Sequence, residues 1–145
     1  MRKTNISING KKFIISVPSE KDWGLVVKKL SPRFRPGLIL AVQGDLGAGK
    51  TTFIQTLAKI LGIKRFVPSP TFALMRSYRL PKAVSGICRL IHVDAYRIKN
   101  ERELAVLDLN EELADGQSML VIEWPERMPS WLKSHADSLI RLNIK

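Results

Sequence analysis

A glycine-rich segment that ends in lysine and threonine has the residue types of a phosphate-binding loop. It reads Gly44-Asp45-Leu46-Gly47-Ala48-Gly49-Lys50-Thr51, matching the pattern of glycine, four residues and Gly-Lys-Thr. Glycines permit the positive backbone dihedrals that turn N–H groups inward, and a helix start adds partial positive charge beneath the anion. The lysine ammonium of such a loop binds the β- and γ-phosphates, and the threonine hydroxyl binds magnesium. The sequence therefore predicts a nucleoside triphosphate site at Lys50 and Thr51.

Two carboxylates follow predicted strands and are candidates for the other side of this site. Asp94 comes directly after the strand pattern at 90–93, and Glu123 comes directly after the apolar run at 119–122. In a parallel sheet the carboxyl ends of the strands lie at the same edge as the phosphate-binding loop. Either residue alone could be an ordinary solvated strand end, but the pair predicts metal binding and orientation of a water. The sequence leaves open which of the two orients the water.

The hydrophobic pattern predicts the elements that would position these groups. Strand patterns occur at residues 6–15 (two strands around an Asn-Gly turn), 38–42, 72–80, 89–93, 119–122 and 138–144, the last expected at a sheet edge. Helix patterns occur at 19–30, 50–62 and 101–107, with 81–86 as a connection. This alternation indicates an α/β fold, a P-loop NTPase-like three-layer sandwich with a small, largely parallel sheet flanked by helices. We expect residues 1–145 to form one domain.

The chain is strongly basic, and its charges are unevenly distributed. Among 145 residues, 24 Lys and Arg against 13 Asp and Glu give a formal net charge of +11. Residues 1–65 hold 13 basic and 3 acidic side chains, whereas residues 103–126 hold 7 acidic and no basic ones. A field of this sign favours encounter with RNA or with an acidic protein, although a merely solvated basic surface has the same composition.

Composition also indicates the compartment. The longest apolar run, at 38–42, is far shorter than the roughly 20 residues of a membrane span. Arg2 and Lys3 are not followed by the apolar stretch of a signal peptide, and the single Cys88 cannot form an intrachain disulfide. We therefore expect a cytoplasmic protein.

Four separated motifs together resemble one family. After the phosphate-binding segment, which continues with Thr52-Phe53, come Ser69-Pro70-Thr71-Phe72, His92-Val93-Asp94-Ala95-Tyr96-Arg97 and Glu123-Trp124-Pro125-Glu126. Their order and spacing are similar to those of TsaE (YjeE), the small bacterial P-loop ATPase of tRNA threonylcarbamoyladenosine synthesis. The similarity extends over roughly residues 17–126. It is specific because Gly-Lys-Thr is shared with many NTPases, whereas the Ser-Pro-Thr-Phe and Glu-Trp motifs are not.

The resemblance implies an ATP-hydrolysing accessory protein that acts with the TsaD–TsaB heterodimer. Its hydrolysis would drive repeated rounds of threonylcarbamoyl transfer to tRNA, with ATP and Mg²⁺ as cofactors and with slow turnover by the isolated chain. Contact with tRNA would be indirect, through the complex. The charge of +11 is more basic than the family pattern, and we interpret it as a surface that faces a protein partner or tRNA.

The resemblance also implies a role for each motif residue. Thr51 and Glu123 should hold magnesium, Asp94 should assist hydrolysis, and Thr71 would sense the γ-phosphate. The implied catalytic residues are Lys50, Asp94, Glu123 and Thr71. The implied nucleotide contacts are Gly44, Asp45, Leu46, Gly47, Ala48, Gly49, Lys50, Thr51, Thr52, Ser19 before the first helix, and Trp124 beside Glu123.

The residues alone leave other interpretations open. His92 alternates with apolar Ile91 and Val93, which favours a structural histidine over a catalytic base. A small-molecule kinase with the same P-loop is one alternative function, and a basic RNA-binding module with ATP as a structural ligand is another. A GTPase is disfavoured because the chain has no Asn-Lys-x-Asp guanine-reading motif.

Overall fold

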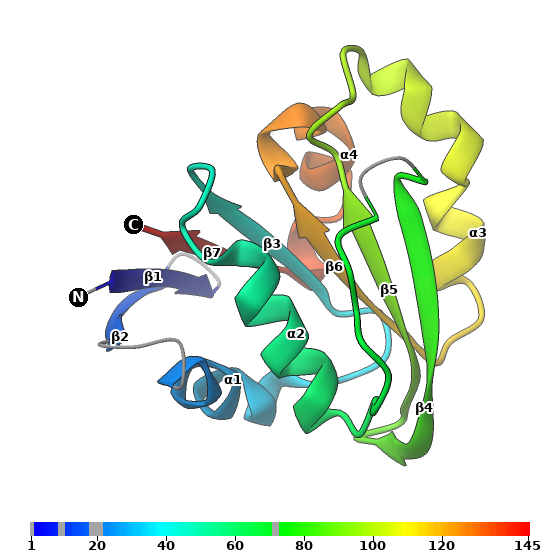
Figure 1. Ribbon diagram of the computed structural model, residues 1–145. Helices are drawn as coiled ribbons and strands as arrows, with labels where there is room; N and C mark the ends of the chain where they lie inside the picture. The colour runs from blue at the N-terminus through cyan, green and yellow to red at the C-terminus, as the bar shows by residue number, and fades with distance from the viewer. Residues whose placement is uncertain (1, 9–10, 18–21, 71–72) are drawn as a thin grey trace.

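A seven-stranded mixed sheet is the centre of the computed structural model, which describes residues 2–8, 11–17, 22–70 and 73–145 (Figure 1). The strands lie in the order β2-β1-β7-β3-β6-β5-β4. Their bounds are β1 Arg2–Ile8, β2 Lys11–Val17, β3 Ile39–Gly44, β4 Met75–Val84, β5 Ile87–Asp94, β6 Ser118–Glu123 and β7 Leu139–Ile144. The four central strands β7, β3, β6 and β5 are parallel, whereas the pairs β1–β2, β1–β7 and β4–β5 are antiparallel.

Helices cover both faces of the sheet and complete three layers (Figure 1). One face carries α1 (Trp23–Leu30) and α2 (Lys50–Ile60), with η2 (Ser31–Arg33) after α1. The other carries η3 (Glu101–Leu107), α3 (Leu109–Leu113) and α4 (Pro129–Ser134), while η4 (Pro125–Arg127) and η5 (Ala136–Ser138) are short connecting turns. The predicted three-layer α/β sandwich is confirmed. No helix in the described ranges is long and apolar enough to cross a membrane.

The alternation of side chains along the strands separates the apolar interior into two cores. One core joins β3, β5, β6 and β7 to the helices α1 and α2, and includes Leu40, Val42, Leu90, Val121, Trp23 and Phe53. The other joins the opposite sides of the central strands to η3, α3 and α4, and includes Ile39, Ile91, Leu120, Leu104, Leu109 and Leu132. Burial on both faces fixes which way each strand residue points.

This alternation sets the direction of the carboxylates at the strand ends. Asp94 lies four residues after Leu90, and Glu123 lies two residues after Val121, so both belong to the side of the sheet that α2 covers. Asp94 and Glu123 are also register partners in the parallel pair β5–β6. The fold therefore brings both carboxylates to the side of the sheet where α2 begins.

The β4–β5 hairpin differs from the prediction. Residues 81–86 were expected to form a connection, but β4 continues through Pro81 to Val84. Proline lacks the N–H that a central strand would need, and β4 tolerates it because it is an edge strand. The turn is only Ser85-Gly86, whose φ values of 51° and 82° are those of a tight hairpin turn.

The position of β7 also differs from the prediction. Residues 138–144 were expected at a sheet edge, but β7 lies between β1 and β3. The predicted pair of N-terminal strands is present as β1 and β2, and β1 covers the outer side of β7. Asn9 and Gly10 of the expected turn lie outside the described residues.

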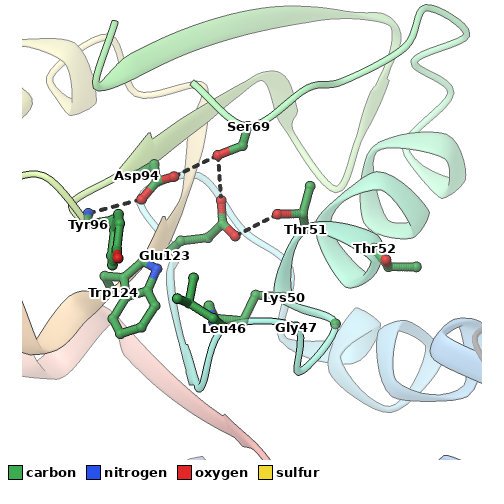
Figure 2. A pocket seen from close by; sticks show the side chains of 11 residues that line it. Leu46, Gly47, Lys50, Thr51, Thr52, Ser69, Asp94, Tyr96, Glu123 and Trp124 are labelled. Carbon is green, nitrogen blue, oxygen red and sulfur yellow. Dashed lines mark hydrogen bonds between the residues drawn. The ribbon is translucent and has the colours of Figure 1, made fainter. Parts of the chain in front are cut away.

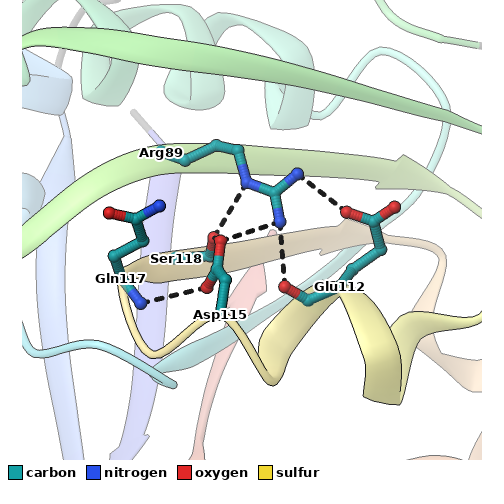
Figure 3. Close-up of polar contacts among 5 residues, drawn as sticks. All are labelled: Arg89, Glu112, Asp115, Gln117 and Ser118. Carbon is teal, nitrogen blue, oxygen red and sulfur yellow. Dashed lines mark hydrogen bonds and ion pairs between the residues drawn. The ribbon is translucent and has the colours of Figure 1, made fainter.

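Arg89 ties the beginning of β5 to β6 and α3, at the end of the sheet opposite the two carboxylates (Figure 3). Its Nε donates to Ser118 Oγ at 2.9 Å, its Nη1 to Glu112 Oε2 at 2.7 Å, and its Nη2 lies 3.0 Å from Asp115 Oδ2. Partial burial tends to raise the pKa of Asp115, but hydrogen bonds from Ser118 and Gln117 and the Arg89 charge outweigh it and lower that pKa. One guanidinium thus satisfies acceptors from two elements.

Replacing Arg89 with methionine, which keeps an unbranched side chain, should lower the free energy of unfolding by about 1–3 kcal/mol. The substitution leaves partly buried acceptors without their charged donor. Urea unfolding of both proteins measures the difference. Arg102→Met removes an exposed arginine of η3 and is the matched control, expected within about 0.5 kcal/mol of the parent. Equal losses in the two variants would contradict the role given to Arg89.

Candidate functional site

The phosphate-binding segment forms a loop between β3 and α2. β3 ends at Gly44, and α2 begins at Lys50. Gly49, the residue before α2, has a φ of 108°, a conformation that residues with a side chain rarely adopt. Gly44 is needed for a different reason, because a Cβ there would lie 2.8 Å from the backbone oxygen of Ile144 in β7. The two glycines therefore let the chain turn into α2 and let β7 approach β3.

Lys50 is buried, and its ammonium lies against the loop. Its Nζ donates to the backbone oxygens of Gly44 at 2.5 Å and Asp45 at 2.7 Å, and lies 4.4 Å from the centroid of a Trp124 ring. Burial lowers the pKa of Lys50 from its usual value, and nearby carboxylates, Glu123 foremost, oppose that shift. An anion bound in the loop would offer this ammonium a charged partner in place of two neutral carbonyls.

Glu123 connects the end of β6 to the first turn of α2 (Figure 2). β6 lies between β3 and β5, and Glu123 is the register partner of Val42 on one side and Asp94 on the other. Its Oε1 accepts a hydrogen bond from the Thr51 hydroxyl at 2.9 Å. Thr51, which follows the P-loop lysine, is thus linked directly to Glu123, which lies 72 positions further along the chain.

His92 holds the other oxygen of the same carboxylate. Its Nε2 lies 2.9 Å from Glu123 Oε2, and its ring is fully buried in β5. Since an ionised carboxylate only accepts hydrogen bonds, Nε2 carries the proton in this contact. The sequence favoured a structural histidine and did not include His92 among the site residues. The structure places it against Glu123, where it orients a residue of the site.

The environment of Glu123 favours its charged form. Burial, with only 3% of the residue exposed, by itself raises the pKa of this carboxyl. Hydrogen bonds from His92 and Thr51, together with the charge of Lys50, outweigh burial and hold the pKa of Glu123 below its usual value. A buried carboxylate that stays ionised is what a magnesium ligand requires.

Asp94 is held by two donors from different segments. Its Oδ2 accepts from the Ser69 hydroxyl at 2.6 Å, and its Oδ1 accepts from the backbone N–H of Tyr96 at 3.0 Å. Ser69 Oγ also lies 3.4 Å from Glu123 Oε2, so this serine stands between the two carboxylates (Figure 2). Ser69 was missed as a site residue, although its place beside Thr71 in the Ser-Pro-Thr-Phe motif was a signal for it.

Trp124 has an unusual backbone conformation next to Glu123. Its φ is 59°, in the left-handed region that bulky residues rarely occupy. Its ring contacts Tyr96 at 4.9 Å between centroids and also lies near the Lys50 ammonium. Such conformations cost free energy and are found more often at functional sites. In this conformation the indole of Trp124 lies beside the P-loop lysine.

Most of these residues line one pocket of about 500 Å³, shown in Figure 2. Its lining is Leu46, Gly47, Gly49, Lys50, Thr51, Thr52, Ser69, Asp94, Tyr96, Glu123 and Trp124. Of the predicted nucleotide contacts, Gly44, Asp45 and Ala48 belong to the loop but not to this lining, and Ser19 lies outside the described residues. The predicted catalytic residue Thr71 also lies outside them. The structure therefore brings together four segments that are far apart in the sequence.

The donor set of the pocket fits a magnesium ion that is bound with a nucleotide. Thr51 Oγ1 and Glu123 Oε1 are hard oxygen ligands 2.9 Å apart. Ligands about 2.1 Å from Mg²⁺ at neighbouring corners of an octahedron are separated by about 3.0 Å. No group of three or more His, Cys, Asp or Glu within the described ranges could hold a metal ion by itself. Magnesium in nucleotide sites usually takes one or two protein oxygens and completes its shell with phosphates and water.

Comparison with known proteins identifies the family. The family model described as "Threonylcarbamoyl adenosine biosynthesis protein TsaE" matches residues 17–145. The chain belongs to the TsaE family. The TsaE protein of Bacillus subtilis is 42% identical over 99 residues, which are 68% of this chain and 58% of that protein. The TsaE protein of Synechocystis is 36% identical over 81% of this chain and 71% of its own length.

A solved structure supports the fold. A crystal structure of Bacillus subtilis YdiB is similar with a TM-score of 0.53 and 28% identity, over 89% of this chain and 71% of that one. The family resemblance deduced from the four motifs is confirmed. This chain spans 58% of the length of the Bacillus subtilis TsaE relative.

The lowered pKa of Glu123 makes the stability of the fold depend on pH. The native state holds this carboxyl ionised at pH values where the unfolded chain has bound a proton. Its contribution is therefore complete above the usual glutamate pKa and is lost as the pH falls through the lower native value. In urea unfolding between about pH 5 and pH 3, the free energy of unfolding should fall more steeply in the parent than in Glu123→Gln.

The control for this measurement is Glu103→Gln, which removes an exposed carboxylate of η3 and the same formal charge. The parent and this control should have similar slopes. If the parent and Glu123→Gln give parallel curves, the hydrogen bonds from His92 and Thr51 do not stabilise the ionised carboxylate.

Proposed function

We propose that this chain is a magnesium-dependent ATPase that assists formation of threonylcarbamoyladenosine in tRNA, acting with the TsaD–TsaB complex. The observation that carries the proposal is the contact of Thr51 with Glu123 at 2.9 Å, directly beside the buried Lys50. It joins the P-loop to an ionised carboxylate in the arrangement that Mg–nucleotide binding requires. Membership of the TsaE family supports the assignment to this tRNA modification.

Each residue of the pocket has a task in this proposal. Loop amides and Lys50 bind the triphosphate, while Thr51 and Glu123 hold magnesium. Magnesium, when bound, neutralises charge that develops on the phosphate oxygens. Asp94 orients the water that attacks the γ-phosphorus, because Glu123 contacts Thr51 and is assigned with it to magnesium. Hydrolysis then breaks the bond between the β-γ bridging oxygen and the γ-phosphorus and gives ADP and inorganic phosphate.

The composition of the pocket supports dependence on a partner. Among the described residues Lys50 is the only cationic side chain that lines it, and no arginine does so. P-loop hydrolases commonly need an arginine near the γ-phosphate, which another protein can supply. We expect slow turnover by the chain alone and faster turnover when TsaD–TsaB is present.

The test is reconstitution with Lys50→Ala as the variant. The parent with ATP should raise the yield of threonylcarbamoyl-tRNA beyond one product per TsaD–TsaB complex, and should release phosphate over repeated rounds without an added acceptor. Lys50→Ala should bind ATP about 10- to 150-fold more weakly, since a charged hydrogen-bond donor is lost, and should give no additional yield. Lys133→Ala, at an exposed position of α4 outside the pocket, is the matched control.

Two outcomes of that test contradict the proposal. Phosphate release only when a small-molecule acceptor is added would indicate a kinase. Tight ATP binding with no hydrolysis, with or without TsaD–TsaB, would indicate a module that holds ATP as a structural ligand.

Glu123→Ala and Asp94→Asn should separate metal binding from orientation of the water. Glu123→Ala should retain nucleotide binding but lose its dependence on magnesium, because a metal ligand is gone. Asp94→Asn should keep magnesium-dependent binding while hydrolysis falls by about 10²- to 10⁴-fold. Titration calorimetry with and without Mg²⁺ and a phosphate-release assay measure the two effects. If Glu123→Ala hydrolyses ATP like the parent, the metal assignment is wrong.

A further inference from the structure

A long stretch of the chain carries positive charge without any compensating acid. Between Asp45 and Asp94 the sequence has no Asp or Glu, but it contains Lys50, Lys59, Lys64, Arg65, Arg76, Arg79, Lys82 and Arg89. Lys50 belongs to the nucleotide pocket, and Arg89 is paired with Glu112 and Asp115. The other six side chains are exposed and have no part in the proposed ATPase site.

Several of these cations gather around an exposed aromatic ring beyond the end of α2. Lys59, Lys64, Arg65 and Phe66 border a hollow of about 530 Å³, and Phe66 is 73% exposed. The guanidinium carbon of Arg65 lies 5.4 Å from the ring centroid of Tyr78 in β4. Arg76 precedes Tyr78 by two residues in the regular part of β4 and therefore lies on the same side of the strand. We call Lys59, Lys64, Arg65, Phe66 and Arg76 the basic surface.

Apart from the contact of Arg65 with the Tyr78 ring, the charges of the basic surface take part in no ion pair among the described residues. Every ion pair found in the described part of the chain involves Arg89 or His92. The cations of the basic surface thus face solvent around a large apolar ring. This placement favours a partner that offers both negative charge and flat rings.

We infer that the basic surface binds RNA directly, through phosphates at its cations and a stacked, unpaired base at Phe66. Lysine and arginine neutralise phosphates whatever the sequence, and aromatic side chains stack on splayed bases of single-stranded loops. A single-stranded RNA loop offers phosphates and unpaired bases side by side, which matches cations gathered around one exposed ring. The inference goes beyond the proposed function, in which tRNA is reached through the complex, and rests on it only for the choice of tRNA as the RNA.

The basic surface is connected to the nucleotide pocket along the chain. Gln55 of α2 donates to the backbone oxygen of Val67 at 3.1 Å, which anchors the segment just after Phe66. Two residues later Ser69 holds Asp94. RNA bound at Phe66 would therefore contact the same short segment that positions a carboxylate of the ATPase site.

The test measures binding of fluorescein-labelled tRNA to the full chain by anisotropy at several KCl concentrations, without ATP or partner proteins. The parent should bind saturably, and its affinity should fall as salt rises. The triple variant Lys59→Ala, Lys64→Ala, Arg65→Ala should reduce the slope of log K against log salt by roughly 2–3. Phe66→Ala should weaken binding about 5- to 150-fold with little change of slope, since it removes stacking and keeps the charges.

The control triple Lys99→Ala, Arg102→Ala, Lys133→Ala removes the same charge from exposed positions outside the basic surface and should leave the slope near that of the parent. A circular dichroism spectrum and a urea midpoint close to those of the parent show that each variant is folded. An equal effect of both triples overturns the inference, because a diffuse positive field would explain binding, and so does absence of saturable binding at low salt. If the first triple weakens association with TsaD–TsaB and not with tRNA, the surface is a protein interface and the inference is wrong.

Failure of the RNA inference and failure of the proposed function give different results. The anisotropy experiment contains no ATP, so its outcome does not depend on Lys50 or Glu123. Conversely, if the chain binds tRNA through the basic surface but releases no phosphate, the RNA inference holds and the proposed ATPase activity is wrong.

Discussion

A buried carboxylate that remains ionised is the constraint on which the site depends. Removing a charge from water costs several kcal/mol unless donors and opposite charges replace the solvent. Glu123 receives hydrogen bonds from Thr51 of α2 and His92 of β5, and the Lys50 charge adds to them. No single element could supply this set. The carboxylate has all of these partners only when the P-loop, β5 and β6 are in register, so the site depends on correct pairing of the strands.

The two apolar cores provide that register. Residues 39–42, 90–93 and 119–122 are buried on both sides of the sheet, and a slip of one residue would move each apolar side chain to the opposite face. Such a slip would also turn Asp94 and Glu123 away from α2. Gly44 also helps to fix the register, because β7 can pair with β3 at this point only where β3 has no side chain in the way. Burial of apolar side chains along the strands thus contributes more to the alignment of the site than its few polar contacts do.

Features that depend on a short stretch of sequence were predicted correctly, and features that depend on which strands lie side by side were missed. The P-loop, the central strands and the carboxylates at their ends are set by residue types within short windows, and the structure has them where they were expected. The alternation of apolar and polar residues in β7 was misread as the sign of an edge strand. Such alternation shows only that one face of the strand is more exposed than the other, and a strand of this kind can still have a neighbour on each side. Pro81 was taken as the end of a strand. A proline is tolerated there because β4 has no neighbour on one side, and a short sequence window does not reveal which strands are neighbours. His92 and Ser69 were undervalued for the same reason, since their partners are distant in sequence and known only once β5 and β6 are paired.

Charge balance links the pocket to the rest of the molecule. A triphosphate brings several negative charges, and within the described residues Lys50 alone lines the pocket as a cation. Magnesium and the loop amides offset part of that charge. The remainder can be met at a distance by the net charge of +11, but such attraction is screened within about 10 Å at 0.1 M salt. A screened field can speed the arrival of ATP, yet it cannot stabilise charge that develops on one oxygen during hydrolysis. If the proposed hydrolysis takes place, that charge calls for a further cation beside Lys50 and magnesium at the γ-phosphate, which supports the proposal that a second protein completes the site.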